Sequence, residues 1–535
     1  MKVLKKEELT IEQKLGMTMC ATLAHGEADI EYVIEKIKNH ACGAVWVSPR
    51  KGVDPGEVIA RVKAAADYPL IVVCDSESGA EPNVIPQQIA LTAAGARDED
   101  AYAFGYATAT ARRKQGYTMI CNPIVDICAH GNTPCGHTTR TFGGSVETVT
   151  RMAKAVARGM HDAGLLACAK HYPGGNEGLP YDTHMREDVA MMDEAELLAT
   201  HMVPYLELLK DGLLDGVMPG HRRFPNIDPA YPSCLSRKVL GLLRERGFDG
   251  VYISDALCMM GVVLKYGPED PVGIAVAAGC DLPLPWEVPF EPAYKAMLSC
   301  YERGIVTEAQ VDECLDRILK TQEKILALPE PPAKIPEEYC ERIARTHTAS
   351  VAAICEDGLD TSISRDGKHL FIIATDGSTV LAPEEYLPGP REWMHPPKVA
   401  EMIAKYFPNS ETVAIGQYPS VSEVMRNFTK QVKFDDVVFI TYGVSSAYIG
   451  PEHMTSRLVS FMDALQTTDR IAAHLYFGNP YVVEDAPYVK RTLMGFTSMR
   501  SVEHALKILA GEAKAEGVLP YDDITFHKKG DIIYR

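Results

Sequence analysis

The stretch LLACAKH, residues 165–171, indicates which fold class this chain adopts. Its first five residues are apolar, so a strand built from them has no face suited to water, and its last two residues are basic. A run that is apolar on both faces is typical of a parallel strand covered by helices. The stretch therefore predicts a buried parallel strand with Lys170 and His171 at its carboxyl end.

Five further runs share this pattern. They are GAVWV (43–47), PLIVVCD (69–75), TMICNPIVD (118–126), GVMPGH (216–221) and GVYISD (250–255). Longer stretches with helical spacing lie between them, such as VETVTRMAKAVARGMHDAG (146–164) and DEAELLATHMVPYLELLKDG (193–212). Alternating strands and helices over about 300 residues predict either a (β/α)8 TIM-like barrel or a doubly wound sheet.

The ends of these runs help to choose between the two architectures. Polar side chains lie at or just after them: Asp75, Asp126, Lys170, His171, His221 and Asp255. Enzymes with a barrel fold build their active sites at the carboxyl ends of several different strands. The sequence therefore favours the barrel, and it predicts an active site at these strand ends.

A Pro-rich segment, ALPEPPAKIPEE (327–338), indicates where the barrel ends. We predict a catalytic barrel domain over residues 1–330, a linker over 331–345 and a second α/β domain over 346–535. The strand-like runs of the second domain are HLFIIATDG (369–377), ETVAIGQYP (411–419), DDVVFITYGV (435–444) and IAAHLYFGNP (471–480). It contains no GxGxxG or Walker-type element, so nothing in its sequence supports nucleotide binding.

Composition limits the partners of the chain. Its 54 Lys and Arg residues stand against 72 Asp and Glu residues, which gives a net charge of −18. Such a surface repels phosphate backbones and anionic lipid, so we expect neither a nucleic-acid nor a membrane partner. The N-terminal segment MKVLKKEELTIEQKLGM has no apolar signal-peptide core. Fourteen cysteines in a chain without such a core predict a cytoplasmic location.

The cysteines give little support to a metal site. No CxxC pair is present, and only Cys121, Cys128 and Cys135 are evenly spaced, in what reads as a Gly/Pro/Asn-rich loop. A metal site there and three free thiols both fit this spacing. The second interpretation is the simpler one, and we predict neither a metal nor an organic cofactor.

Asp255 is the first candidate for chemistry. It follows the apolar residues of GVYISD and precedes ALCMM, and a carboxylate in such surroundings is costly unless it is hydrogen-bonded or used in a reaction. One interpretation is that Asp255 caps the next helix. The other is that it is a nucleophile, which requires a second group able to act as an acid.

The spacing of Asp182 and His184 supplies such a group. In an extended Asp-x-His segment both side chains point the same way, so the carboxylate can hold one imidazole nitrogen while the other gives or takes a proton. The alternative is an exposed turn with an incidental histidine. The Gly/Pro-rich stretch PGGNEGLP (173–180) before it predicts a loop with unusual backbone angles that can bring His184 over a pocket.

Lys170, His171 and Arg140 are candidate donors to a ligand rich in hydroxyl groups. Adjacent side chains of a regular strand point to opposite faces, so Lys170 and His171 can share one site only if the strand is irregular there. Arg140 has the alternative role of a surface ion pair. A carboxylate, an Asp-oriented imidazole and several donors together fit a retaining glycosidase, with histidine in the place of the usual second carboxylic acid.

The sequence resembles glycoside hydrolase family 3, and within it the β-N-acetylglucosaminidases. The matching motifs run in order over most of the first 330 residues: VVCDSESGA, NPIVDI, TTRTFGG, KHYPG, DGVMPGH, GVYISDALCM and AVAAGCDLPL. The second domain resembles the C-terminal α/β sandwich domain of two-domain members and contains the similar motif FGNPY (477–481).

The resemblance implies a role for each candidate residue. Asp255 corresponds to the nucleophile, and Asp182 with His184 corresponds to the acid/base dyad of the glucosaminidase branch. The positions that bind the sugar are Asp75, Arg140, Lys170 and His171. The implied activity is that of a retaining, exo-acting β-N-acetylglucosaminidase, a hydrolase of O-glycosyl bonds with a small carbohydrate substrate and no cofactor.

Three departures from the family pattern leave alternatives open. PGGNEG (173–178) stands where those enzymes have Pro-Gly-His-Gly, Ala256 follows the nucleophile position, and Arg222-Arg223 form a basic pair after VMPGH. The alternatives are a glycoside phosphorylase, because a neutral imidazole does not repel phosphate and Arg222, Arg223 or Lys170 can help to bind it; a family 3 β-glycosidase for another sugar; and a non-catalytic carbohydrate-binding protein.

Overall fold

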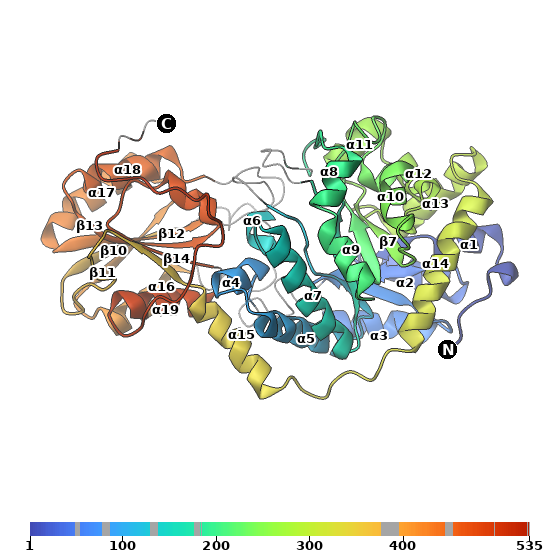
Figure 1. Cartoon of the computed structure of the whole chain (residues 1–535), viewed down its shortest axis with the longest axis horizontal. Coiled ribbons are helices and arrows are strands. Elements are labelled where there is room, and N and C mark those ends of the chain that lie inside the picture. Colours follow the sequence, from blue (N-terminus) through green and yellow to red (C-terminus); the bar gives the residue numbers. More distant parts are fainter. Residues whose placement is uncertain are drawn as a thin grey trace. The chain divides into compact units, whose positions relative to one another are not determined.

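Eight parallel strands, each paired with the next one along the chain, form the sheet of the first unit in the computed structural model (Figure 1). They are β1 (Cys20–Thr22), β2 (Ala44–Trp46), β3 (Ile71–Asp75), β4 (Met119–Cys121), β5 (Leu166–Tyr172), β6 (Gly216–Pro219), β7 (Val251–Ala256) and β8 (Leu282–Leu284). β8 comes back into contact with β1, so the sheet is a nearly closed barrel. The predicted TIM-like barrel is confirmed, and the doubly wound sheet is wrong.

Helices follow most of these strands and form the outer layer. They are α1 (Ile11–Met17), α2 (Glu27–Lys38), α3 (Pro55–Ala65), α5 (Asp98–Lys114), α7 (Val146–Asp162), α8 (Glu194–Ala199), α9 (Val203–Lys210), α10 (Arg237–Arg244), α11 (Met260–Tyr266), α12 (Asp270–Ala278), α13 (Phe290–Glu302) and α14 (Glu308–Leu326). Local sequence sets where they begin: the hydroxyl of Ser145 accepts from the backbone N–H of Thr148 at the start of α7.

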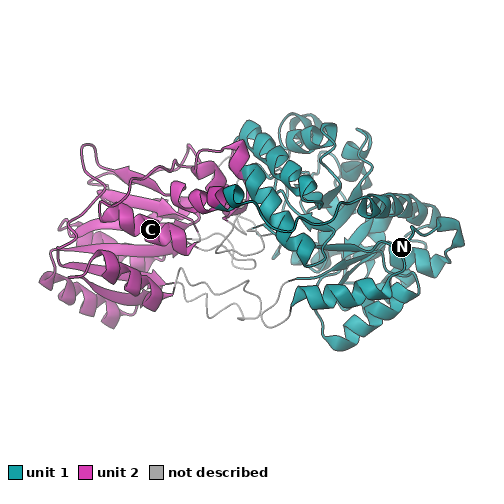
Figure 2. Ribbon diagram, turned by 90° about the horizontal axis from the view of Figure 1, so that it is seen from below, with its two compact units in different colours: residues 1–80, 101–127, 145–340 teal, residues 81–100, 128–144, 341–535 magenta. Residues whose placement is uncertain are grey.

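The structure describes residues 1–48, 54–77, 86–128, 137–175, 182, 184–375, 395–443, 453–496, 498–531 and 533. The chain divides into two compact units, coloured separately in Figure 2. Unit 1 contains residues 1–80, 101–127 and 145–340, and unit 2 contains residues 81–100, 128–144 and 341–535. Two short segments that follow β3 and β4 along the chain therefore group with the C-terminal part.

Unit 2 is built around a six-stranded sheet in the order β11-β10-β12-β13-β14-β9. Its strands are β9 (Ala352–Cys355), β10 (His369–Thr375), β11 (Glu411–Gly416), β12 (Asp436–Gly443), β13 (Ile471–Gly478) and β14 (Arg491–Gly495). All neighbours pair in parallel except β14 and β9, which are antiparallel. The four predicted runs form the parallel core β10 to β13, and the predicted α/β sandwich is confirmed.

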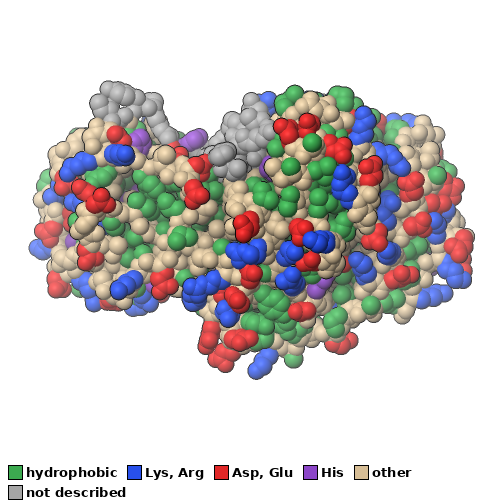
Figure 3. Space-filling model, in the orientation of Figure 1, with side chains coloured by type: hydrophobic (Ala, Val, Ile, Leu, Met, Phe, Trp, Pro, Cys, Tyr) green, Lys and Arg blue, Asp and Glu red, His purple; other side chains and the backbone are tan. Residues whose placement is uncertain are grey.

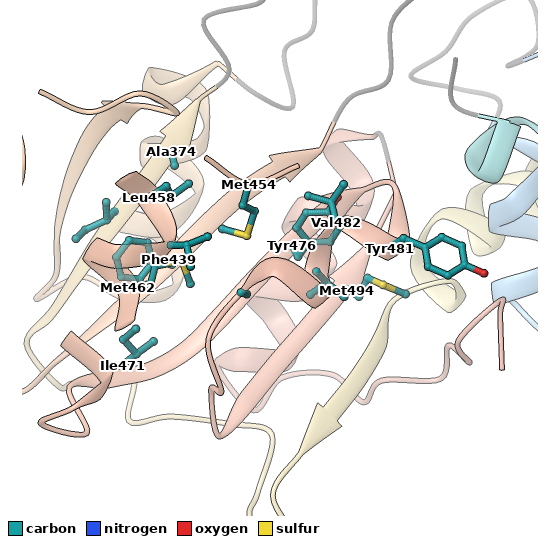
Figure 4. Close-up of a cluster of buried hydrophobic side chains, with 14 of the residues drawn as sticks. Ala374, Phe439, Met454, Leu458, Met462, Ile471, Tyr476, Tyr481, Val482 and Met494 are labelled. Atoms are coloured by element: carbon teal, nitrogen blue, oxygen red, sulfur yellow. The ribbon is translucent and has the colours of Figure 1, made fainter. Parts of the chain in front are cut away.

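Side chains on the two faces of this sheet belong to two separate apolar clusters. Phe371 and Ile373 of β10 pack with α16 (Pro396–Tyr406) and α19 (Met499–Leu509), whereas Leu370 and Ile372 pack with α18 (Ser456–Gln466). Figure 4 shows part of the second cluster, where Phe439, Leu458, Met462 and Tyr476 are labelled. α4 (Gln88–Ala93) also contributes to it. The other helices of unit 2 are α6 (His137–Arg140) and α17 (Val421–Lys430), and α15 (Glu337–Ala349) lies at its start.

The surface carries charges of both signs. Lys and Arg side chains lie among Asp and Glu side chains over the face shown in Figure 3. Within the described part of the chain, no helix is both long and apolar enough to cross a membrane.

The first prediction concerns Asp281, whose buried carboxylate holds the start of β8. It accepts hydrogen bonds from Arg244 Nη2 at 2.7 Å and Arg317 Nε at 2.7 Å, and from the backbone N–H of Tyr252 at 2.6 Å. We expect Asp281→Ala to lower the free energy of unfolding by about 3–5 kcal/mol, because two partly buried guanidinium groups lose the fully buried carboxylate that pairs with them. Urea unfolding measures this loss.

Asp249 provides the matched control for this experiment. Its carboxylate pairs with Lys320, and both side chains are at least half exposed. Asp249→Ala should therefore cost less than about 1 kcal/mol. Equal losses for the two variants would show that the buried pair has no special role in stability.

The second prediction concerns His474 in the core of unit 2. Its Nε2 lies 2.7 Å from Thr441 Oγ1, and burial of the neutral ring lowers the pKa of His474 to about 3 from its usual 6.5. Between these two values the unfolded chain binds a proton that the folded chain does not. Acidification therefore removes stability, by about 2 kcal/mol between pH 6.5 and pH 5.

A His474→Gln variant tests this pH dependence. We expect its free energy of unfolding to fall by about 2 kcal/mol less than that of the wild type between pH 7 and pH 5. His40→Gln, at a partly exposed histidine of unit 1, should keep the dependence of the wild type. The prediction fails if His474→Gln and the wild type lose equal stability on acidification.

Candidate active site

Lys170, near the end of β5, lies between two carboxylates. Its Nζ lies 2.5 Å from Asp75 Oδ1, at the end of β3, and 2.6 Å from Glu77 Oε1. The Lys170 side chain is only 2% exposed, whereas that of Asp75 is 47% exposed. The ends of β3 and β5 thus bring together Asp75 and Lys170, two of the residues selected from the sequence. The Lys170 ammonium group is buried, and the Asp75 carboxylate is partly open to solvent.

His171 is held by a different carboxylate, that of Asp126. The Nδ1–H and the backbone N–H of His171 donate to Asp126 Oδ2, at 2.7 and 3.2 Å. Because an ionised carboxylate only accepts, Nδ1 of His171 carries a proton. The pairing register between β5 and β6 shifts between Lys170 and Tyr172, so the strand is irregular at this point, as a shared site requires.

Asp182 and His184 form the pair that their spacing predicts. The Nδ1–H and the backbone N–H of His184 donate to Asp182 Oδ1, at 2.8 and 2.9 Å. The Asp182 side chain is 2% exposed and the His184 side chain 25% exposed, so the interpretation as a freely exposed turn is wrong. The carboxylate thus fixes the orientation of the imidazole through Nδ1.

The segment of His184 is tied to the chain that follows β7. The backbone N–H of Met260 donates to the carbonyl oxygen of His184 at 3.0 Å. Of the preceding Gly/Pro-rich stretch, Gly174 and Gly175 have φ angles of 85° and 86°, the unusual backbone angles that were predicted. Residues 176–181 and Thr183 lie outside the described residues, so the altered PGGNEG loop has no structural account.

Asp255 lies near the end of β7 and is not a helix cap. Its Oδ1 accepts from the backbone N–H of Ala256 at 2.7 Å, and the next helix, α11, begins only at Met260. Burial by itself raises the pKa of Asp255. Charge interaction with the protonated forms of His221, His171 and His184, together with the Ala256 N–H, opposes it and holds the pKa well below its usual range. Asp255 is therefore ionised at neutral pH.

His221, at the end of the β6 segment, holds the backbone beside Asp255. Its Nε2 lies 2.8 Å from the carbonyl oxygen of Ala256 and its Nδ1 lies 3.1 Å from Cys234 Sγ. A carbonyl only accepts, so Nε2 carries the proton. Burial raises the pKa of Cys234, so its thiol stays protonated and donates to Nδ1, and burial lowers the pKa of His221. We take this imidazole as neutral and structural.

The arginine candidates have different positions. Arg140 is the last residue of α6 and belongs to unit 2, so its predicted place among the other site residues stays a prediction. Arg222 Nε donates to Asp188 Oδ2 at 2.7 Å, and Arg223 Nε donates to Glu187 Oε1 at 2.7 Å. Both members of the basic pair therefore already interact with carboxylates.

The cysteine prediction was partly wrong about position. Cys121 is the last residue of β4 and is buried, as is Cys128, and Cys135 lies outside the described residues. Among the residues that the structure describes, no three potential ligand side chains are grouped as a metal ion requires. The thirteen described cysteines are free thiols.

Sequence reasoning did not assign Glu77, Asp126 or His221 to the site. Asp126 and His221 were recognised as polar residues at strand ends, but their partners depend on which strands are neighbours. The signal for Glu77 is its spacing from Asp75, since residues two apart on an extended segment point the same way. With them, the site has an ionised carboxylate near the end of β7, an Asp-oriented imidazole and a lysine between two carboxylates.

The sequence around these site residues is similar to that of known glycosidases. The family model "Glycosyl hydrolase family 3 N terminal domain" matches residues 10–321. A β-N-acetylglucosaminidase/β-glucosidase of Cellulomonas fimi is 29% identical over 332 residues, which are 58% of this chain and 57% of that protein. A β-hexosaminidase of Tolumonas auensis is 30% identical over 260 residues, or 46% of this chain and 76% of that protein. The chain thus spans little more than half the length of the first relative.

Solved structures resemble the whole described fold. A family 3 β-N-acetylglucosaminidase from Paenibacillus has a TM-score of 0.82 at 24% identity, with 97% of this chain and all of that chain covered. A β-glucoside phosphorylase has a TM-score of 0.80 at 21% identity, with 97% of each chain covered. At these identities the likeness concerns the fold alone.

Proposed function

This chain belongs to glycosyl hydrolase family 3, and from that premise we propose that it is a retaining, exo-acting β-N-acetylglucosaminidase. The observation that carries the proposal is the hydrogen-bonded pair of Asp182 and His184, which is tied through Met260 to the chain after Asp255. An ionised nucleophile and a separately oriented acid are the two groups that a retaining mechanism needs. The names of the β-hexosaminidase relatives support the sugar.

In the first step, an Asp255 carboxylate oxygen attacks the anomeric carbon of the sugar. The bond from that carbon to the leaving oxygen breaks, and His184 Nε2 gives its proton to this oxygen. The low pKa of Asp255 keeps the nucleophile ionised. Asp182 keeps the ring of His184 in place through Nδ1.

In the second step, water replaces the enzyme carboxylate. His184 Nε2, now neutral, takes a proton from the water, whose oxygen bonds to the anomeric carbon from the face that the leaving group left. Asp255 departs as a carboxylate, so the sugar is released with its β configuration. The atoms and charges of the enzyme are then those of the starting state.

The remaining candidate residues are proposed to bind the sugar. Asp75 offers an exposed carboxylate to hydroxyl groups, and Lys170 is fixed next to it by two ion pairs. His171 presents Nε2 because Asp126 holds Nδ1. Arg140 is proposed as a further contact on the basis of the TTRTFGG motif alone.

Product analysis tests the activity. The chain is incubated with p-nitrophenyl N-acetyl-β-glucosaminide, with and without millimolar phosphate, and the products are identified by mass spectrometry. We expect free N-acetylglucosamine in both samples. If no product forms in either sample, a panel of other β-glycosides distinguishes a different sugar specificity from a non-catalytic carbohydrate-binding protein.

Phosphorolysis is the second candidate, because His184 rather than a carboxylate acts in the second step. A neutral imidazole allows a phosphate anion to approach, as a carboxylate would not. However, Arg222, Arg223 and Lys170, the cations available for phosphate, are all paired with carboxylates. Hydrolysis is therefore the first choice, and a sugar 1-phosphate formed only in the presence of phosphate would reverse it.

Two further statements belong to this proposal. The thirteen described cysteines are free, which supports the cytoplasm as the location, since thiols persist in a reducing compartment. A barrel domain over residues 1–330, a linker over 331–345 and a second domain over 346–535 remain the proposed division. Cell fractionation and limited proteolysis test the two statements.

A further inference from the structure

Exposed apolar side chains of unit 1 gather next to the proposed acid. Among its described residues, six large hydrophobic side chains are exposed: Met1, Met185, Met191, Met260, Leu264 and Leu326. Four of these six, all except Met1 and Leu326, lie in segments that are joined to the backbone of His184. Single exposed hydrophobic residues are ordinary, but a group beside a reactive residue indicates a binding surface.

Hydrogen bonds join these segments into one continuous rim, made of residues 184–191, 222–232 and 260–266. Met260 N–H donates to His184 O at 3.0 Å, which joins the first segment to the third. Arg223 N–H donates to Asp188 O at 2.9 Å, which joins the second to the first. The hydroxyl of Tyr266 donates to the carbonyl oxygen of Ala230 at 2.5 Å, which joins the third to the second.

Two residues of this rim are linked directly to His184, one by the peptide chain and one by a hydrogen bond. Met185 directly follows His184 and is 50% exposed, and Met260 is bonded to its carbonyl and is 46% exposed. Leu264, 74% exposed, lies four residues after Met260 in α11 and therefore on the same helix face. Exposed apolar side chains therefore lie in the segments that are bonded to the backbone of the acid, whereas Lys170, Asp75 and Glu77 form the polar part of the site.

We propose that Met185, Met260 and Leu264 form the leaving-group subsite and that it takes glycosides with an apolar alkyl or aryl aglycone. This inference rests on the proposed function. A general acid must lie within hydrogen-bond reach of the oxygen that it protonates, so the group attached to that oxygen extends past His184 and onto its neighbours. Methionine side chains adapt to irregular apolar shapes, so a range of aglycones fits.

The test compares two substrates that differ only in apolar length. Methyl and n-hexyl N-acetyl-β-glucosaminides have similar leaving alcohols, and the hexyl chain has five additional methylene groups. A methylene fully removed from water contributes up to about fourfold in binding. For an open rim that covers part of the chain, we expect kcat/KM for the hexyl glycoside to exceed that for the methyl glycoside by about 10–50-fold.

Variants connect this preference to the rim. The ratio should fall below about threefold in Met260→Ser/Leu264→Ser and should fall clearly in Met185→Ser, because a hydroxyl replaces the apolar contact. Leu326→Ser is the matched control: its side chain is 48% exposed in the same unit but outside the rim, and it should keep the ratio of the wild type. Circular dichroism checks that each variant is folded.

The outcomes separate this inference from the proposed function. If the wild type turns over neither glycoside, the proposed function fails. If it turns over both at equal rates, or if the rim variants and Leu326→Ser keep the same preference, the function stands and the apolar subsite is overturned.

Discussion

The variant Asp255→Asn is expected to lose activity by about 10⁴-fold or more in kcat/KM, the largest effect of any single substitution in this chain. An amide cannot form the ester intermediate, whereas Asp255 has a low pKa and is ionised. Initial rates with p-nitrophenyl N-acetyl-β-glucosaminide measure the loss. Thermal unfolding of the same sample shows whether the fold is kept.

A control variant and a chemical rescue show whether the loss of activity is specific to the Asp255 carboxylate. Asp249→Asn, at an exposed carboxylate of the same unit, should retain the activity of the wild type. In Asp255→Ala, added azide can enter from the face that the carboxylate occupied and should give the α-glycosyl azide. Turnover by Asp255→Asn within threefold of the wild type would mean that another group is the nucleophile.

For His184→Ala we expect a loss of about 10²–10⁴-fold with alkyl glycosides, whose leaving oxygen needs a proton. The loss in the first step should be much smaller with a dinitrophenyl glycoside, because that leaving group departs without an acid. Release of the sugar should then become slow, since the base for water is missing. A burst of dinitrophenol followed by slow turnover is therefore the expected time course.

The chain offers a matched control for this substitution. His40 and Asp67 form an Asp-His pair at 2.8 Å outside the site, so His40→Ala should leave the kinetics unchanged. Asp182→Asn should show a smaller loss than His184→Ala, because it disturbs the orientation of the ring and keeps the nitrogen. If His184→Ala slowed alkyl and dinitrophenyl glycosides equally and gave no burst, His184 would not be the acid/base group.

The barrel could be predicted because most of its strands lie in apolar runs that end in a polar residue. β5 carries this signal most clearly, with Leu166 to Ala169 buried and Lys170 after them. β1 and β8 were not among the six runs, and length alone is not the reason, since β2 and β4 also have three residues but were found within the longer runs 43–47 and 118–126. The resemblance, not the pattern, pointed to the segment that contains β8.

The second unit was harder to predict in its edges than in its centre. The strands β10 to β13 are long and apolar, but β9 pairs antiparallel with β14, about 140 residues later in the chain, and no local pattern encodes such a pairing. The sequence also did not predict that α4 belongs to unit 2. Its residues Ile89 and Ala90 follow a barrel strand in sequence but pack in the core of unit 2, and no local pattern encodes this contact.

In the candidate site, the sequence predicted contacts between residues that are near one another in the chain, but not contacts between residues of different strands. Asp182 and His184 are two residues apart, so their contact follows from local geometry, and it is present at 2.8 Å. The contact of His171 with Asp126 joins residues of different strands, so it requires the strand order and the register. The departure of β5 from a regular strand beside Lys170 is likewise set by its pairing with β6.

The most direct test of the account is to trap the glycosyl-enzyme. A 5-fluoro N-acetyl-β-glucosaminyl fluoride keeps the 2-acetamido group, reacts in the first step and is released slowly, because the fluorine at C5 destabilises both oxocarbenium-like transition states. We predict a mass increase of one fluoro-sugar on the intact protein, and peptide fragmentation should place the ester on Asp255. An adduct on a different carboxylate, or release of a sugar with inverted configuration, would contradict the account.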